Sequence, residues 1–229
     1  MLATTFFMAF FTAAVLPAVN SAHDAARATA MKNKGRGIWI SVVSANTERE
    51  ILDMAPLWPG DLARDGKKFE NAEEYFCYLM SDGEDTKVIA RDPSNRVVPD
   101  LKPEMLVGPG MTAAVPGGPL RPENNAWHVV NIDDESWGET PFLVTRNIKA
   151  SAISYSTEAE LENLDAAPVP VPLDKNIQPF KNTLGVWVTK GGAMHDARQR
   201  YLIRARLVFV RQPADQPDLT VLPAQGGFQ

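Results

Sequence analysis

The first 22 residues carry no charged side chain, and this run limits what the chain can fold into more than any other part of its sequence. Because an α-helix rises about 1.5 Å per residue, a helix over Met1 to Ala22 would be roughly 33 Å long, close to the thickness of a bilayer's hydrocarbon core. Its threonines can return their hydroxyl groups to the preceding turn, so lipid tolerates them. Pro17 removes one backbone hydrogen bond and predicts a loosened or kinked helix. We therefore expect a helix that lipid or other apolar helices can surround.

The helix is expected to continue past Ala22, because residues 23–46 are rich in alanine and other helix formers. Further along, apolar side chains recur at spacings of three and four and form a stripe able to lie on a sheet: Ile38, Trp39, Val42 and Val43. Gly35 and Gly37 each weaken a helix by about 1 kcal/mol relative to alanine. We expect one helix over residues 1–46, apolar all round in its first half and one-sided in its second.

Three interpretations of this start are open. The run can be read as a cleaved signal peptide with Asn20-Ser21-Ala22 as its cleavage site, but no basic residue precedes the apolar stretch, which counts against that reading. It can also be read as an ordinary membrane anchor. The third interpretation, which we favour, follows from a resemblance.

The run Ala13–Ala22, followed by Asp24-Ala25-Ala26-Arg27 and Lys32-Asn33, resembles the start of type IV pilin-like proteins. Those proteins commonly read F-T-L-V-E-M-L, then an apolar stretch, then L-P-A and a helix rich in alanine and arginine. In this alignment Met1-Leu2 match the residues after the family's glutamate, and Pro17 matches its helix-loosening proline. The glutamate would stand immediately before Met1, so either the natural start of the chain lies upstream, which we favour, or the chain is not processed as a pilin. Phe142–Asn147 and Gly185–Val188 also look like segments of large pseudopilins.

The resemblance implies a subunit of a type II secretion pseudopilus or of a type IV pilus-like filament. Such a subunit is held in the inner membrane with a periplasmic head, or stands in an extracellular filament. Its implied partners are other copies of itself or other pilin-like subunits, the inner-membrane assembly platform and the prepilin peptidase. The residues that would form the assembly helix are Leu2, Phe6, Phe7, Phe10, Phe11, Val15, Leu16, Pro17 and Val19.

Residues 47–229 read as a globular head of mixed α+β type, so the whole chain is expected to be a long N-terminal hydrophobic helix packed on a small antiparallel sheet with long loops. Asn71 predicts the cap of a short helix that ends near Ser81. Strands are predicted over 127–132, 142–148, 184–190 and 201–210, with Gly191-Gly192 as a hairpin turn. Residues 91–125 are rich in proline and glycine and predict a long loop, and the tail from Gln212 is expected to be loosely ordered.

The two parts are expected to meet through the apolar stripe of the helix. We predict that Ile38, Val42 and Val43 pack against a sheet that holds Val186, Val188 and Leu207. Burial of each aliphatic side chain would contribute about 1.5–3 kcal/mol.

The densest acidic cluster is Asp133-Asp134-Glu135, in a loop after a predicted strand. Calcium prefers several such oxygens, and some pseudopilins bind calcium in a C-terminal loop, so these residues are the weak candidates for a metal site. The ligand pattern of an EF-hand is missing, and a solvated loop is the favoured interpretation. No other cofactor is expected.

No catalytic constellation is evident, and we expect that the protein is not an enzyme. Cys77, the only cysteine, lies in an apolar run and is predicted to be a buried small hydrophobe; no sequence feature ties His23, His128 or His195 to it. The net charge of −5 argues against a nucleic-acid partner, because phosphate binding needs a basic face.

The alternative function is a secreted or membrane-anchored periplasmic domain that binds a ligand. A glycan is the ligand considered, because Trp58, Trp127 and Trp137 could stack on sugar rings if they are exposed.

Overall fold

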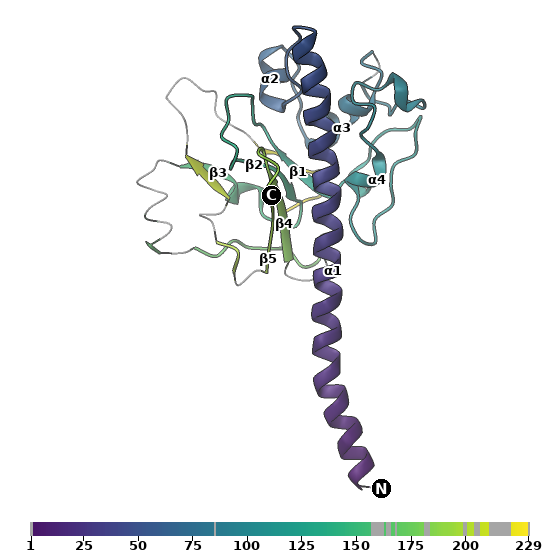
Figure 1. The fold of residues 1–229 in the computed structure, drawn as a ribbon, viewed down its shortest axis with the longest axis vertical. Coiled ribbons are helices and arrows are strands. Elements are labelled where there is room, and N and C mark those ends of the chain that lie inside the picture. The colour runs from purple at the N-terminus through teal and green to yellow at the C-terminus, as the bar shows by residue number, and fades with distance from the viewer. Residues whose placement is uncertain are drawn as a thin grey trace.

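The computed structural model is α+β, with one long helix beside an antiparallel sheet of five strands (Figure 1). It describes residues 2–84, 86–156, 163, 166–167, 169–180, 184–198, 201–203, 207–210 and 221–228, and only the backbone of residues 2–18, 154–156 and 208–210. The helices are α1 (Leu2–Ile51), α2 (Pro59–Arg64), α3 (Ala72–Met80), α4 (Pro103–Leu106) and the short 3-10 helices η1 (Pro93–Asn95), η2 (Pro122–Asn124) and η3 (Ala150–Ala152). The strands are β1 (Trp127–Val130), β2 (Pro141–Thr145), β3 (Ser154–Ser156), β4 (Leu184–Thr189), β5 (Met194–Arg198), β6 (Val208–Val210) and β7 (Val221–Leu222).

Helix α1 joins the head through one narrow stripe of its surface. Buried residues follow each other at spacings of three and four, with Ser41 also buried beside them: Ala28, Met31, Gly35, Ile38, Val42 and Ala45. This spacing places them on one face of the helix, as the apolar pattern predicted. The helix ends at Ile51, one turn beyond the predicted end near Asn46.

The five-stranded sheet has the order β5-β4-β2-β1-β7, and α1 lies against β4 and β5. The Trp39 indole nitrogen donates a hydrogen bond of 2.6 Å to the Lys190 carbonyl, at the turn that joins these two strands. Gly192 in this turn has φ of +84° and lies under the Trp39 ring, so the predicted glycine hairpin is confirmed and a side chain there would be both strained and obstructed. The sequence-predicted strands near 127, 142 and 184 are likewise confirmed as β1, β2 and β4.

Gly35 is placed where α1 comes closest to the sheet. A β-carbon on Gly35 would lie 2.6 Å from Cγ2 of Val188 and 3.1 Å from the Trp127 ring, and both of those side chains are buried. The glycine, which weakens the isolated helix, is therefore the residue that allows the helix to approach β4.

Gly35→Ala is expected to be about 1–3 kcal/mol less stable than Gly37→Ala, because overpacking at position 35 costs that amount while the gain of about 1 kcal/mol in helix propensity is common to both variants. Gly37→Ala is the matched control, since its β-carbon would meet only the flexible Met105 side chain at 3.2 Å. Urea unfolding of both variants measures the difference. Equal stability of the two variants would contradict the close approach of α1 to β4.

Helix α3 forms as its sequence predicts. The Asn71 side chain caps it by accepting a hydrogen bond of 2.9 Å from the Glu74 backbone N–H, and the helix ends before Ser81. Its apolar residues Tyr75, Phe76, Leu79 and Met80 are fully buried in the head.

Two predictions about the C-terminal third are wrong. Of the predicted strand 201–210, the structure describes residues 201–203 and 207–210. Leu207 directly precedes β6, which pairs in parallel with β3 in a separate two-stranded sheet, so Leu207 does not stand in the sheet that holds Val186 and Val188. The tail is also built into the head from residue 221 onwards. Strand β7 pairs with β1, and the Phe228 backbone N–H donates to the Arg146 carbonyl at 2.9 Å. Residues 211–220 lie outside the described residues.

Candidate functional site

The predicted assembly helix is the N-terminal half of α1. Its backbone is helical from Leu2, and Figure 1 shows this half running out of the head and away from the sheet. Most of the predicted assembly side chains lie outside those that the structure describes: Leu2, Phe6, Phe7, Phe10, Phe11, Val15, Leu16 and Pro17. Val19 is described and is 53% exposed. Within the described residues, no helix combines the length and the apolar character that a membrane crossing requires.

The outer face of α1 continues this exposed surface along the head. It consists mostly of small and polar residues, all of them exposed: Ala22, Ala25, Ala26, Thr29, Ala30, Asn33, Arg36, Ile40, Ser44 and Thr47. The Thr29 hydroxyl donates to the Ala25 carbonyl at 2.9 Å and the Thr47 hydroxyl to the Val43 carbonyl at 3.0 Å, so these polar groups are satisfied within the helix. A helix surface of small residues lets a second helix approach closely.

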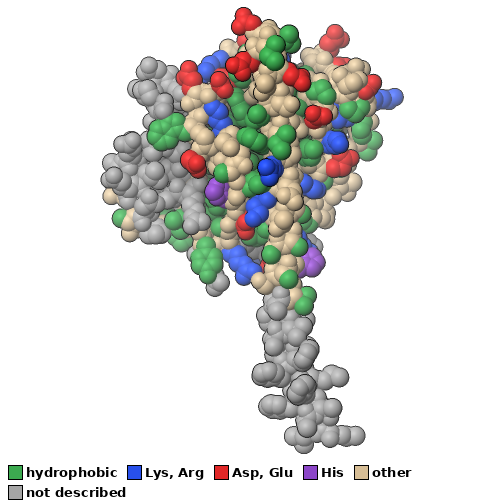
Figure 2. Space-filling model, viewed as in Figure 1, with side chains coloured by type: hydrophobic (Ala, Val, Ile, Leu, Met, Phe, Trp, Pro, Cys, Tyr) green, Lys and Arg blue, Asp and Glu red, His purple; other side chains and the backbone are tan. Residues whose placement is uncertain are grey.

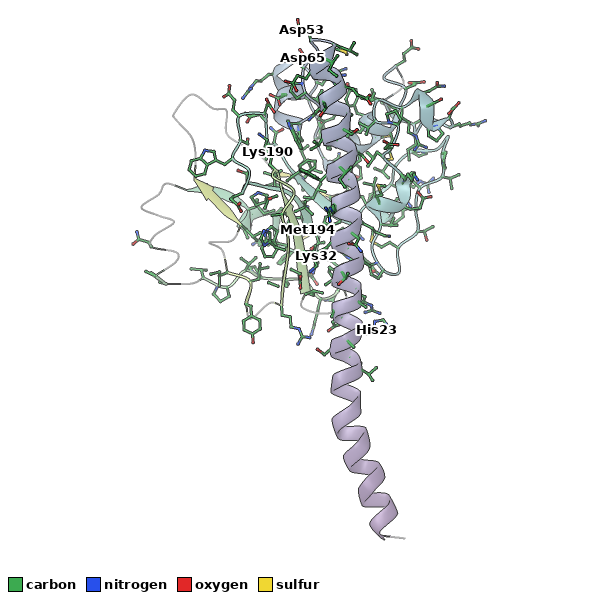
Figure 3. All side chains as sticks on the ribbon, viewed as in Figure 1. His23, Lys32, Asp53, Asp65, Lys190 and Met194 are labelled. Atoms are coloured by element: carbon green, nitrogen blue, oxygen red, sulfur yellow. The ribbon has the colours of Figure 1, made fainter. Side chains whose placement is uncertain are left out.

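The basic residues that follow the apolar run attach α1 to the head. The Lys32 ammonium forms an ion pair of 2.5 Å with Asp196 of β5 (Figure 3). The Lys34 ammonium donates to the Val107 carbonyl at 2.8 Å, and burial lowers its pKa. Arg198 of β5 donates to the Ser21 hydroxyl at 3.1 Å. These side chains therefore join α1 to β5 and to the segment that follows α4.

The acidic cluster is not a solvated loop throughout. Asp133 is only 4% exposed, and it accepts hydrogen bonds from the Arg64 guanidinium and, at 2.7 Å, from the Ser136 hydroxyl. Asp134 and Glu135 are exposed. The described residues contain no group of three or more His, Cys, Asp or Glu side chains arranged to hold a metal ion.

The same region holds a second buried carboxylate that the sequence did not single out. Asp61 of α2 accepts hydrogen bonds from Arg64 at 3.2 Å and from the Asp134 backbone N–H at 2.8 Å. Burial raises the pKa of Asp61 to about 6, although the Asp134 N–H and the Arg64 charge act in the other direction. The Lys190 ammonium donates to the Ser136 carbonyl at 2.8 Å. Together these contacts bind the loop to α2 and to the β4–β5 turn, which is a structural role.

His128 of β1 is fully buried and holds the C-terminal segment. Its Nδ1 accepts a hydrogen bond of 2.9 Å from the Ala224 backbone N–H, and its Nε2 lies 3.1 Å from the Ile148 carbonyl. An N–H group can only donate, so the ring is neutral with its proton on Nε2. Desolvation lowers the pKa of His128 to about 4, because a charged ring would lack water and would face the Ala224 N–H.

Acidification is expected to destabilise the head through His128. The unfolded chain binds a proton below the ordinary pKa of 6.5, whereas the folded chain binds it only near 4, so stability falls as the pH drops between these values. From pH 7 to pH 5 the loss from this group is about 2 kcal/mol. Asp61 acts in the opposite direction, since its raised pKa favours the folded state below about pH 6.

A comparison of the unmodified chain with His128→Gln isolates the contribution of His128, because Asp61 is present in both proteins and its effect cancels in the difference. The stability advantage of the unmodified chain over His128→Gln is expected to shrink by about 2 kcal/mol between pH 7 and pH 5, as measured by urea unfolding. A difference that does not change with pH would contradict a buried, neutral His128.

Most of the other candidate functional residues are packed within the head. Cys77 is buried at 5% exposure, as predicted. The His195 ring stacks on Trp187 with 5.2 Å between the ring centroids. Trp58 and Trp127 are 4% and 0% exposed, so these two rings belong to the core and do not meet the condition for stacking on a sugar, and only Trp137 of the three, at 44%, can reach a ligand. Large aromatic rings remove more apolar surface from water than smaller side chains do when they are buried, which accounts for the positions of Trp58 and Trp127 in the core.

Sequence reasoning missed a cavity of about 580 Å³ on the head. Its walls come from the segment before α3, from α3 itself and from three distant segments: Lys67, Lys68, Phe69, Tyr78, Lys87 and Leu120 are among its lining residues. The one signal that could have indicated it is the Lys67-Lys68-Phe69 triplet, two cations beside an aromatic residue just before a capped helix.

Comparison with known proteins identifies no relative: no protein-family model, no curated protein and no solved structure matches this chain.

Proposed function

We propose that this protein is a pilin-like structural subunit that assembles through α1 into a type II secretion pseudopilus or a type IV pilus-like filament, and that it is not an enzyme. The observation that carries the proposal is the division of α1 into two parts. Residues 28–45 give one stripe of side chains to the core of the head, while the N-terminal half extends out of it (Figure 1). The extending half coincides with the charge-free run.

A helix with this composition needs an apolar environment that its own head does not supply. Lipid can supply it before assembly, and a bundle of the same helices can supply it afterwards. The transfer between these two environments has a small free-energy difference, because both are apolar and the backbone hydrogen bonds are made within the helix in each. Pro17 would let the helix bend as the bundle packs.

The outer face of α1 supports the same arrangement within the head region. Small side chains with internally bonded hydroxyls allow neighbouring copies to pack their helices closely while each head keeps its own core. Cells that make the protein would then hold it in the inner membrane, with the head in the periplasm, until it is added to a filament.

The test compares the chain of residues 1–229 with a chain that lacks residues 1–22. Fractionation determines whether each form needs detergent, and negative-stain microscopy determines whether filaments form. Filaments or detergent dependence in the first form only is the expected result; a soluble monomer in both forms would exclude the proposal. The periplasmic glycan-binding alternative is not favoured by any particular contact, since two of its three tryptophans are buried.

A further inference from the structure

The end of α1 presents an exposed apolar group of side chains with acidic neighbours. Ile51, Leu52 and Met54 are 80%, 68% and 46% exposed, and exposed carboxylates stand among them, on Glu48, Glu50 and Asp53. We call residues 48–54 the tip. Figure 2 shows acidic and apolar side chains gathered at this end of the head, opposite the end from which the N-terminal half of α1 leaves. Contiguous exposed apolar side chains of this kind mark interaction sites.

Hydrogen bonds join the tip to the last turns of α1 and to the segment that follows. Asp53 has φ of +54°, the left-handed conformation that closes a helix, and the Met54 backbone N–H donates to the Arg49 carbonyl at 2.9 Å. The Arg49 guanidinium donates to the Ala55 carbonyl at 2.6 Å, and the Leu57 backbone N–H to the Asn46 side chain at 2.6 Å. A partner therefore meets a preformed surface, and little ordering is required on binding.

The cavity of about 580 Å³ is lined by lysines and apolar side chains, which complement the acidic and apolar side chains of the tip, and we call it the lysine pocket. Phe69, Tyr78 and Leu120 contribute apolar surface, with the Phe69 and Tyr78 rings 5.7 Å apart. Lys67 and Lys68 are exposed beside this surface, and neither pairs with a carboxylate among the described residues. The Lys67 ammonium lies 4.8 Å from the centre of the Tyr78 ring.

The two carboxylates that also line the pocket are already bonded within the head. Glu73 is buried and accepts hydrogen bonds from Asn125 at 3.0 Å and from the Gln225 backbone N–H at 3.1 Å. Glu74 accepts from the Glu70 backbone N–H at 2.8 Å and from Asn71 at 3.1 Å. These two carboxylates are therefore engaged within the head, and Lys67 and Lys68 are charged side chains of the pocket that a partner's carboxylates can reach.

We infer that the lysine pocket of one copy receives the tip of a second copy, with Ile51 and Leu52 against Phe69, Tyr78 and Leu120, and with Glu48 and Glu50 beside Lys67 and Lys68. The inference rests on the proposed function and names the contact by which neighbouring heads recognise each other. The tip and the segment that leads into the pocket lie at the same end of the head, where Figure 3 labels Asp53 and Asp65. Two copies that stand side by side with parallel α1 helices thus carry the tip and the segment that leads into the pocket at the same end of their heads.

Charge exchange tests the contact in the chain of residues 1–229. The tip variant is Glu48→Lys with Glu50→Lys, which also suits the C-terminal end of a helix and so keeps the fold. The pocket variant is Lys67→Glu with Lys68→Glu. Each variant alone is expected to slow assembly after detergent removal by about tenfold or more, because like charges then face each other. The chain that carries all four substitutions is expected to return to within about threefold of the unmodified rate.

Glu139→Lys and Lys102→Glu are the matched controls, since both residues are exposed and neither belongs to the tip or the pocket. Light scattering gives the rates. The contact would be overturned, and the filament function would stand, if the tip variant or the pocket variant assembled at the unmodified rate. The same conclusion would follow if the chain with all four substitutions stayed slow. Slow assembly of the tip variant with normal assembly of the pocket variant would mean that the tip binds another surface, and this result would overturn the pocket as its partner. An unmodified chain that stays monomeric would overturn the proposed function and the contact together.

Discussion

A chain that lacks residues 1–22 is expected to be a folded, soluble monomer, whereas the chain of residues 1–229 is expected to need detergent or to polymerise. The buried stripe of α1 starts at Ala28, so the deletion removes none of its residues. Ser21 meets the head through one exposed hydrogen bond from Arg198, whose loss has a small effect on stability. The charge-free surface that the deletion removes is too large to remain in water.

A single charge near the middle of the apolar run is expected to have nearly the same effect as the deletion. Phe10→Lys raises the free energy of membrane insertion by about 2.5–3.5 kcal/mol and would place an unpaired ammonium inside a helical bundle. Both storage in the membrane and filament growth should suffer. Phe10→Leu is the matched control, because it changes the shape of the side chain and keeps it apolar.

Fractionation and negative-stain microscopy of the four forms separate the competing interpretations of the first 22 residues. Filaments from the full chain and from Phe10→Leu, with none from the deletion or from Phe10→Lys, would support assembly through the helix. A soluble monomer cleaved after Ala22 would instead identify a signal peptide, and the periplasmic binding alternative would then take the place of the filament proposal.

The sequence predicted the contacts that follow from a regular period. Ile38 and Val42 lie on the buried stripe because apolar residues spaced by three and four share one face of any helix. Asn71 caps α3 because its side chain accepts a hydrogen bond from a backbone N–H that the helix leaves unpaired. Gly192 closes the β4–β5 turn because a residue without a β-carbon adopts its positive φ without strain.

The sequence could not predict the contacts that depend on which elements meet. The alternating pattern around Leu207 predicts a half-buried strand without identifying its neighbour, and the strand that forms beside Leu207, β6, pairs with β3 outside the five-stranded sheet. The need for glycine at position 35 arises only when Val188 and Trp127 come against α1. The lysine pocket joins segments from residue 67 to residue 120 and beyond, and no local signal relates them.

Val42→Asp is expected to unfold the head, or to destabilise it by about 4 kcal/mol or more, which is a large part of the roughly 5–15 kcal/mol that stabilises an ordinary domain. Val42 is 0% exposed on the stripe that faces the sheet, where Val186 and Val188 are also 0% exposed. The substitution removes about 1.5–3 kcal/mol of apolar burial. It also places a carboxylate where water is excluded, and such a group lowers the stability further because it has to be protonated or hydrated.

The experiment uses the chain of residues 23–229, so that aggregation through the apolar run does not obscure unfolding. Ser44→Asp is the matched control, because Ser44 is exposed two residues further along the same helix and outside its last turn. Thermal unfolding should show Ser44→Asp within about 0.5 kcal/mol of the parent chain and Val42→Asp without a cooperative transition at the parent's melting temperature. A melting temperature that Val42→Asp leaves unchanged would mean that α1 does not lie on β4. The proposed packing of neighbouring helices would then lose its basis, because the outer face of α1 consists of the side chains that the buried stripe leaves exposed to a second copy.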